Sequence, residues 1–146
     1  MFEVIYYSML GITKKVAQAI AAELGVKAEN VKAKEGLTKD SFVFLGSGCY
    51  GHKPGRRLQR FIASNDFKGR QVALFGTSGD GKGNEVKAMA ELLKPKGALI
   101  KGSFYCKGRA FFFLNWGHPS KEELANAREF ANEMKKSKQN KAKSKK

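Results

Sequence analysis

Two spacings of hydrophobic residues alternate along this chain. Short runs rich in apolar residues are typical of strands that are buried in a parallel sheet, and ENVKA adds a weaker run of this kind. Between these runs, apolar residues recur every three or four positions, as on one face of a helix. The expected strands are residues 2–7, 29–33, 41–46, 70–76 and 98–106. The expected helices are residues 14–24, 56–64, 84–94 and a last one that begins after Ser120.

The order of these elements predicts the class of fold. Strands alternate with helices, and the connections between them are short. This pattern predicts an α/β protein in which a doubly wound, five-stranded parallel sheet is covered by helices on both faces. The last helix has the clearest start signal, because Ser120 and Glu123 form a capping box directly after Pro119. Its expected apolar face consists of Leu124, Ala127, Ala131 and Met134.

Length and composition limit the class of protein further. A chain of 146 residues suits one domain with a single hydrophobic core. No apolar run approaches the ~20 residues that span a bilayer, and the N-terminal MFEVIYY lacks the basic start of a signal peptide. Cys49 and Cys106 make neither a disulfide framework nor a metal motif. We therefore expect a cytoplasmic protein with no membrane span and no metal site.

The positive charge is concentrated at the C-terminus. The chain carries a net charge of +15, and its last twelve residues, KKSKQNKAKSKK, hold seven lysines and no acid. The remaining 21 basic and 13 acidic residues leave a net +8 on residues 1–134. This composition predicts a domain over residues 1–134 and a disordered lysine-rich tail over residues 135–146. The tail is either a weak tether to nucleic acid, an anionic surface or an acidic protein, or a solubilising terminus.

Three loops follow strands at the edge of the sheet where ligands bind in such folds. The first loop places hydroxyls beside a glycine at the start of a helix, where unpaired N–H groups suit a phosphate monoester. Lys14 and Lys15 follow in the first helical turn and favour a bound anion, because they would otherwise face the positive end of the helix. The residues of this loop are Ser8, Met9, Leu10, Gly11, Ile12 and Thr13.

The second and third loops suit a flat ring. In the second loop, Tyr50 lies between glycines and offers an aromatic surface for stacking. The third loop offers small residues and many backbone groups for hydrogen bonds to the edge of a ring. The second loop consists of Ser47, Gly48, Cys49, Tyr50, Gly51 and His52, and the third of Thr77, Ser78, Gly79 and Asp80. One phosphate and one heterocycle on a doubly wound sheet suggest FMN.

Two stretches in these loops fit the consensus of a nucleotide-binding motif but lack the neighbouring residues that the motif requires. GSGCYG at 46–51 fits G-x-G-x-x-G, but no acidic residue ends the next strand, and Lys53-Pro54-Gly55 delays the helix. GTSGDGK at 76–82 fits a P-loop, but Gly83 stands where a magnesium-binding hydroxyl is needed. We therefore predict neither a dinucleotide nor a nucleoside triphosphate.

Four stretches resemble the flavodoxin family: VIYYSMLGIT, FLGSGCYGHKPGRRLQRFI, ALFGTSGDGKG, and the segment from FYCKG to GHPSKEELANAREFAN. The resemblance covers about residues 2–134 and implies a strand order of 2-1-3-4-5, FMN at the strand ends and electron transfer. It assigns residues 8–13 to the phosphate and residues 47–52 and 77–80 to the isoalloxazine, with Tyr50 stacked on it. Leu10 and Ile12 depart from the Thr and Asn usual in the family, which removes two contacts worth ~1.5–3 kcal/mol each.

Three functions fit these features. The first is an FMN-binding electron carrier with acidic redox partners, since the domain is basic. The second is a small FMN-dependent NAD(P)H oxidoreductase. The third is a flavin-free module that binds nucleic acid or an acidic partner through its basic surface. The absence of a nicotinamide signature favours the carrier over the enzyme, and no catalytic residue is assigned.

Overall fold

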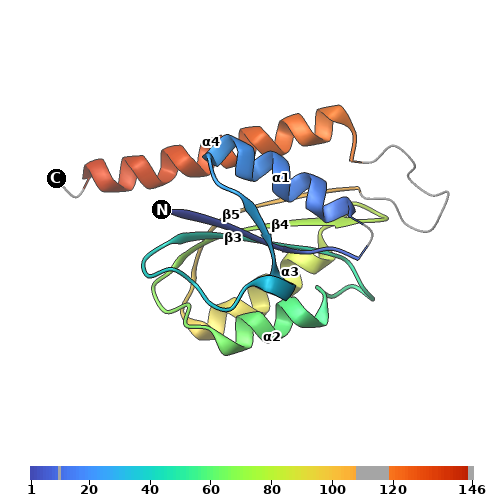
Figure 1. Ribbon diagram of the computed structural model, residues 1–146, viewed down its shortest axis with the longest axis horizontal. Helices are drawn as coiled ribbons and strands as arrows, with labels where there is room; N and C mark the ends of the chain where they lie inside the picture. The colour runs from blue at the N-terminus through green and yellow to red at the C-terminus, as the bar shows by residue number, and fades with distance from the viewer. Residues whose placement is uncertain (10, 108–118, 145–146) are drawn as a thin grey trace.

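The computed structural model describes residues 1–9, 11–107 and 119–144, with side chains through residue 138. Strands and helices alternate along the chain, and the helices lie on both sides of one sheet (Figure 1). The strands are β1 (Phe2–Tyr7), β2 (Ala28–Asn30), β3 (Phe42–Gly48), β4 (Gln71–Ser78) and β5 (Leu99–Lys107). The helices are α1 (Ile12–Leu24), α2 (Arg56–Ser64), α3 (Asn84–Leu93) and α4 (Lys121–Ser144). Short 3₁₀ helices span Val31–Ala33 and Lys94–Lys96.

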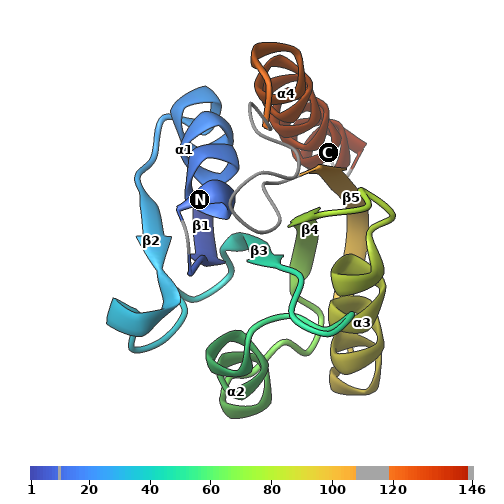
Figure 2. The ribbon, with the colours of Figure 1, turned by 90° about the vertical axis from the view of Figure 1, so that its right-hand side faces the viewer.

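The sheet has the topology that the sequence predicts. Its order is β2-β1-β3-β4-β5, and every pairing is parallel (Figure 2), which confirms the doubly wound arrangement. Tyr7 at the end of β1 pairs with Ser47, and Gly48 at the end of β3 pairs with Thr77. The carboxyl ends of these three strands therefore lie at the same level, and the three loops that follow them meet at one edge.

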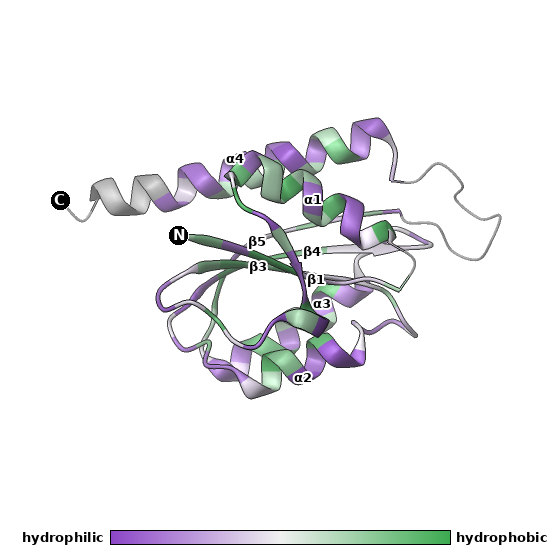
Figure 3. Cartoon of the chain, viewed as in Figure 1, coloured by the Kyte–Doolittle hydropathy of each residue, from purple (hydrophilic) through white to green (hydrophobic). Residues whose placement is uncertain are grey.

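Each face of the sheet has its own hydrophobic core. Helices α1 and α4 cover one face, and α2 and α3 cover the other, with their apolar sides turned inward (Figure 3). Strand β3 serves both cores, because alternate residues point to opposite faces. Phe42 and Phe44 pack towards α1 and α4, whereas Val43 and Leu45 pack towards α2 and α3. This explains why the strand is apolar at successive positions.

The capping box of α4 forms as expected. The Ser120 hydroxyl oxygen accepts the N–H of Glu123 at 3.2 Å, and the Glu123 carboxylate accepts the N–H of Ser120 at 2.9 Å. Ala127 and Ala131 are fully buried, and Leu124 and Met134 pack against the same core. The apolar face of this helix is confirmed.

Strands β3 and β4 run two residues further than expected, to Gly48 and Ser78. Two elements differ more from the expectation. The weak strand expected at residues 29–33 is Ala28–Asn30, because the Asn30 side chain accepts the N–H of Lys32 at 2.9 Å and starts a 3₁₀ turn. Residues 135–144, expected to be disordered, continue α4. Lysine is a good helix former, and extending a helix that is already nucleated adds one hydrogen bond per residue. Residues 145–146 lie outside the described residues.

The extension of α4 contacts the N-terminus of the chain. Lys138 Nζ donates a hydrogen bond to the Met1 carbonyl at 3.0 Å and lies 4.5 Å from the centre of the Phe2 ring. The rest of the extension projects past the amino ends of the strands (Figure 1). Across residues 1–9, 11–107 and 119–144, no helix combines the length and apolar character that crossing a membrane requires.

Candidate functional site

Hydrogen bonds join the first loop to both of the others at the carboxyl edge of the sheet. The N–H of Met9 donates to the Tyr50 hydroxyl at 3.1 Å, which ties the first loop to the second. The hydroxyls of Thr13 and Thr77 lie 2.8 Å apart and share a buried hydrogen bond, which ties the start of α1 to the third loop. Residues far apart in sequence therefore form one site, as the strand order predicts.

The second loop is also joined to the start of α3. The side-chain amide of Asn84 lies 3.1 Å from Nδ1 of His52. His52 has a φ of 65°, in the left-handed region that non-glycine residues rarely occupy. The contact ties the exposed His52 of the second loop to the first residue of α3, a few residues after the third loop.

The first loop leaves the beginning of α1 open to an anion. Gly11 precedes the helix with a φ of 80°, and no side chain in the described part of the chain caps the first N–H groups. The first turn has no acidic residue, while Lys14 and Lys15 are exposed there. Unpaired N–H groups and the positive helix end both favour a phosphate at this position. Leu10, which the sequence assigns to this loop, lies outside the described residues.

Thr13 and Ser47 are both buried, and the hydroxyl of each makes a hydrogen bond to another segment of the chain. Thr13 is bonded to Thr77, as described above. Ser47 is fully buried, donates to the Gly48 carbonyl at 2.7 Å and accepts the N–H of Gly55 at 3.0 Å. It therefore fastens the second loop to the start of α2, a role that its position in the loop pattern does not reveal.

Tyr50 spans the first and second loops. Its ring packs edge-on against Tyr7, with centroids 5.6 Å apart and planes at 74°. Its hydroxyl reaches Met9, whose side chain is 67% exposed. A cavity of about 470 Å³ lies beside the ring, with Lys53 and Arg56 on its wall. Tyr50 is thus an aromatic wall at the mouth of the site, positioned from both of its ends.

The third loop is a tight turn built by its own side chains. The Ser78 hydroxyl donates to Asp80 Oδ1 and accepts the N–H of Gly81, both at 3.0 Å. Asp80 Oδ1 also accepts the N–H of Lys82 at 3.0 Å. The bonds from Lys82 and Ser78 lower the pKa of Asp80. The loop therefore presents an exposed, ionised carboxylate beside Gly79.

One residue of this site was missed by sequence reasoning. Glu85 lies in the first turn of α3 and has no exposed surface. It stands one position before the apolar stripe that begins at Val86, so the periodicity places it at the margin of the helix face. Its burial depends on Gly76 in β4 and on Cys49 in the second loop, and no local pattern relates these positions to Glu85.

Comparison with known sequences identifies the family. The family described as "Flavodoxin domain" matches residues 3–145, almost the entire chain. The chain therefore belongs to the flavodoxin family, as its loop motifs indicated. An uncharacterized protein of Methanocaldococcus jannaschii is 30% identical over 130 residues, covering 82% of this chain and 87% of that protein.

Solved structures agree with the fold. A flavodoxin from the domain Archaea superposes with a TM-score of 0.68 at 20% identity, covering 89% of this chain and 92% of its own. Oxidised flavodoxin 1 from Bacillus cereus superposes with a TM-score of 0.70 at 18% identity, covering 92% and 97%. Flavodoxin relatives imply a flavin cofactor and redox partners. The uncapped start of α1 and the small residues of the other two loops fit such a cofactor.

Proposed function

We propose that this protein binds FMN at the three-loop edge and carries electrons between redox proteins. The observation that supports this most directly is the open start of α1, whose first N–H groups have no side-chain cap among the described residues and follow a loop that contains Ser8 and Gly11. Among the described residues, this start lies beside two further loops suited to a ring. Bound FMN would supply the ability to accept and release electrons.

Different loops of the chain would bind the phosphate and the ring of FMN. Residues 8–13 would bind the phosphate, mainly through backbone N–H groups, since Thr13 is already bonded to Thr77. Residues 47–52 and 77–80 would flank the ring, with Tyr50 as the stacking residue. The bond from Met9 to Tyr50 supports this assignment, because it fixes the aromatic ring between the phosphate loop and the ring-flanking loop.

The charges around the edge point to the kind of partner. Lys53, Arg56, Arg57 and Lys82 are all exposed in or next to the two ring-flanking loops. A unit charge ~8 Å away contributes about 0.5–2 kcal/mol, depending on the effective dielectric constant. These cations favour a negatively charged reduced flavin, so its potential should be less negative than in acidic flavodoxins. They also favour partners with acidic docking faces.

Titration with FMN, riboflavin and FAD tests the proposal. FMN should bind more tightly than riboflavin, because only FMN carries the phosphate that the first loop is proposed to hold. Leu10→Thr with Ile12→Asn should tighten FMN and leave riboflavin unchanged. Tyr50→Ala should weaken both by ~1–3 kcal/mol, the range of other aromatic–heterocycle stacks. Absence of FMN binding would overturn the proposal and favour the flavin-free module.

The oxidoreductase is a second candidate, and the cavity beside Tyr50 favours it. At about 470 Å³, with Lys53 and Arg56 on its wall, this cavity has room and positive charge for a second anionic ligand. Rapid mixing of FMN-loaded protein with NADPH distinguishes the two functions. An enzyme would bleach the flavin at a rate that saturates with NADPH and falls in Arg56→Gln, whereas a carrier would not react.

A further inference from the structure

Glu85 is a buried acid to which the proposed binding of FMN assigns no role. Its side chain is fully buried, and neither carboxylate oxygen has a hydrogen-bond partner among the described residues. Its carboxyl group packs on the backbone of Gly76, where a Cβ atom would overlap Oε1. Gly76 thus creates the space for this carboxyl group at the end of β4, directly before the third loop.

The groups around Glu85 come from both ring-flanking loops and do not neutralise it. The Cys49 thiol faces Glu85 from the second loop, and the negative charge of Asp80 in the third loop raises the pKa of Glu85. The charge of Glu85 in turn helps to raise the pKa of Cys106 in β5. None of the ion pairs among the described residues involves Glu85. Burial raises the pKa of Glu85, its own backbone N–H and the Cys49 thiol lower it in part, and Asp80 raises it again; the net shift is upward.

A purely structural role explains Glu85 poorly. An acid in the first helical turn interacts well with the helix dipole, but an exposed acid already gains about 0.3–1 kcal/mol from this interaction without the cost of burial. A buried carboxyl group without partners costs stability, most of all when it is ionised. Perturbed acids of this kind gather at functional sites. Glu85 lies beneath the two loops that would hold the flavin ring. A change in the charge of its carboxyl group would therefore act on that ring.

We propose that Glu85 is a proton-binding site linked to reduction of the flavin. The inference rests on the proposed function, because it needs FMN at the three-loop edge. As one electron arrives from the redox partner, one proton from solvent binds a Glu85 carboxylate oxygen and forms its O–H bond. The added negative charge is thereby balanced next to the ring. The reduction potential should consequently fall as the pH rises and Glu85 becomes harder to keep protonated.

Redox titrations of the FMN-loaded protein, at pH values from the ordinary glutamate value of 4.5 upward, test this linkage. The wild-type protein should show a steeper fall of potential with pH than Glu85→Gln, which cannot ionise. Glu91→Gln is the matched control, because Glu91 lies on the same helix but is exposed. It should keep the wild-type slope. Equal slopes in the wild-type protein and Glu85→Gln would overturn the inference and leave FMN binding intact.

A second measurement uses the flavin-free protein. Carbon NMR of ¹³C-labelled glutamate side chains should show one carboxyl group that titrates above the ordinary value of 4.5 and is missing in Glu85→Gln. If Glu85→Gln does not fold, Asp80→Asn should move that titration to lower pH. The inference would be overturned if no glutamate titrated above the ordinary value. A raised titration in a protein that never binds FMN would overturn the linkage together with the proposed function.

Discussion

Two buried glutamates lie at opposite edges of the same sheet and have opposite surroundings. Glu3, in β1, is 4% exposed, and its Oε2 lies 2.7 Å from Lys34 Nζ. Its Oε1 accepts hydrogen bonds from the N–H of Thr38 at 2.7 Å and from the Ser41 hydroxyl at 2.5 Å. Glu85 has no exposed surface and no such partners among the described residues. Equal burial of one side chain type thus produces two different environments.

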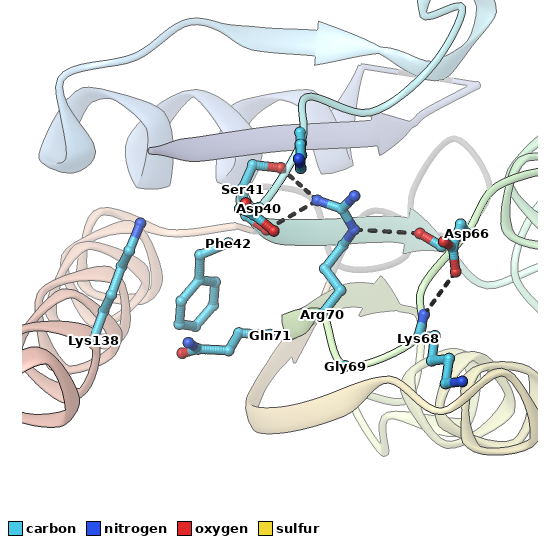
Figure 4. Close-up of a pocket in the computed structure, with 10 residues that line it drawn as sticks. Asp40, Ser41, Phe42, Asp66, Lys68, Gly69, Arg70, Gln71 and Lys138 are labelled. Atoms are coloured by element: carbon cyan, nitrogen blue, oxygen red, sulfur yellow. Dashed lines mark hydrogen bonds between the residues drawn. The ribbon is translucent and has the colours of Figure 1, made fainter. Parts of the chain in front are cut away.

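The partners around Glu3 belong to a wider network at the amino edge of the sheet. Figure 4 shows Arg70 reaching across a cavity of about 460 Å³ to the segment that contains Ser41. One guanidinium nitrogen of Arg70 donates to the carbonyls of Thr38 and Ser41 at 2.9 and 3.1 Å, and to the Ser41 hydroxyl at 2.9 Å. Arg70 therefore fastens the start of β4 to the segment that contains Thr38 and Ser41.

The difference appears in how the two groups ionise. Burial opposes ionisation of Glu3, but hydrogen bonds from Lys34, Ser41 and Thr38 outweigh it, so the pKa of Glu3 is lowered. The pKa of Glu85 is raised, since its partial compensation is smaller than the cost of burial. A buried carboxylate that is paired with a cation and accepts hydrogen bonds, as Glu3 does, contributes to stability. One without such partners can change its protonation state in response to a nearby charge.

The largest expected effect is loss of the partners around Glu3. Glu3→Gln should lower the free energy of unfolding by about 3 kcal/mol, because it removes the buried negative charge that Lys34, Thr38 and Ser41 contact. Lys34 keeps its second partner, Glu29, at 2.9 Å. Urea unfolding of the flavin-free protein, followed by circular dichroism, measures this. Glu91→Gln, on an exposed surface, should change stability by less than about 0.5 kcal/mol. A loss below about 1 kcal/mol for Glu3→Gln would contradict the comparison.

The pH dependence of this contribution has a definite sign. The folded-state pKa of Glu3 lies below its ordinary value of 4.5, so its stabilisation is fully present above that value. It should be lost as the pH falls through the lowered pKa. The difference in stability between the wild-type protein and Glu3→Gln should therefore shrink in acid.

The next effect tests the space that holds Glu85. Gly76→Ala should destabilise the protein by about 2 kcal/mol, because the new methyl group overlaps the Glu85 carboxyl group. The same substitution in a Glu85→Ala background should cost much less, since the overlapping atoms are absent. Urea unfolding of all four proteins gives the coupling energy between the two positions. Additive effects would show that the carboxyl group does not occupy this space.

A smaller effect separates the two glutamates directly. In the flavin-free protein near pH 8, Glu85→Gln should change stability by less than about 1 kcal/mol, in the stabilising direction, because it removes a buried charge without breaking an ion pair. The folded-state pKa of Glu85 is raised, so the wild-type protein should lose stability relative to this variant as the pH rises above 4.5. A large loss, like that expected for Glu3→Gln, would mean that Glu85 has partners after all.

The smallest effect concerns the neighbour of Glu85. Asp80 raises the pKa of Glu85 through its negative charge, so Asp80→Asn should shift the pH dependence of stability to lower pH. The free energy of unfolding is measured across pH for Asp80→Asn and for the double variant that also carries Glu85→Gln. The midpoint pH of their difference is compared with the midpoint of the difference between the wild-type protein and Glu85→Gln. An unchanged midpoint would show that the third loop does not act on the buried acid.

Much of the fold could be predicted because it depends on local patterns. The α2 helix runs from Arg56 to Ser64, the bounds that the spacing of Leu58, Phe61 and Ile62 predicts. The capping box at Ser120 was equally local. The helical extension of α4 was not predicted, since composition alone does not show that the start of the helix is packed and capped.

The candidate site was predicted as three loops but not as a set of contacts. A strand–turn–helix pattern places residues 8–13, 47–52 and 77–80 at one edge of a parallel sheet. It does not show that the N–H of Met9 is taken by Tyr50, or that Ser47 holds the start of α2. These bonds join residues about 8 to 41 positions apart, and their geometry depends on how the strands pair.

The sequence by itself determined the alternation of elements, the edge where the loops gather and the family, because these follow from periodicity, turn residues and local motifs. Only the tertiary structure decided the fate of the two buried glutamates. Glu3 and Glu85 are identical as letters, and each stands beside apolar residues. Their ionisation depends on whether Lys34 and Ser41, or Gly76 and Cys49, are brought against them. The cost of burying a charge is set by such neighbours, and distant parts of the chain supply them.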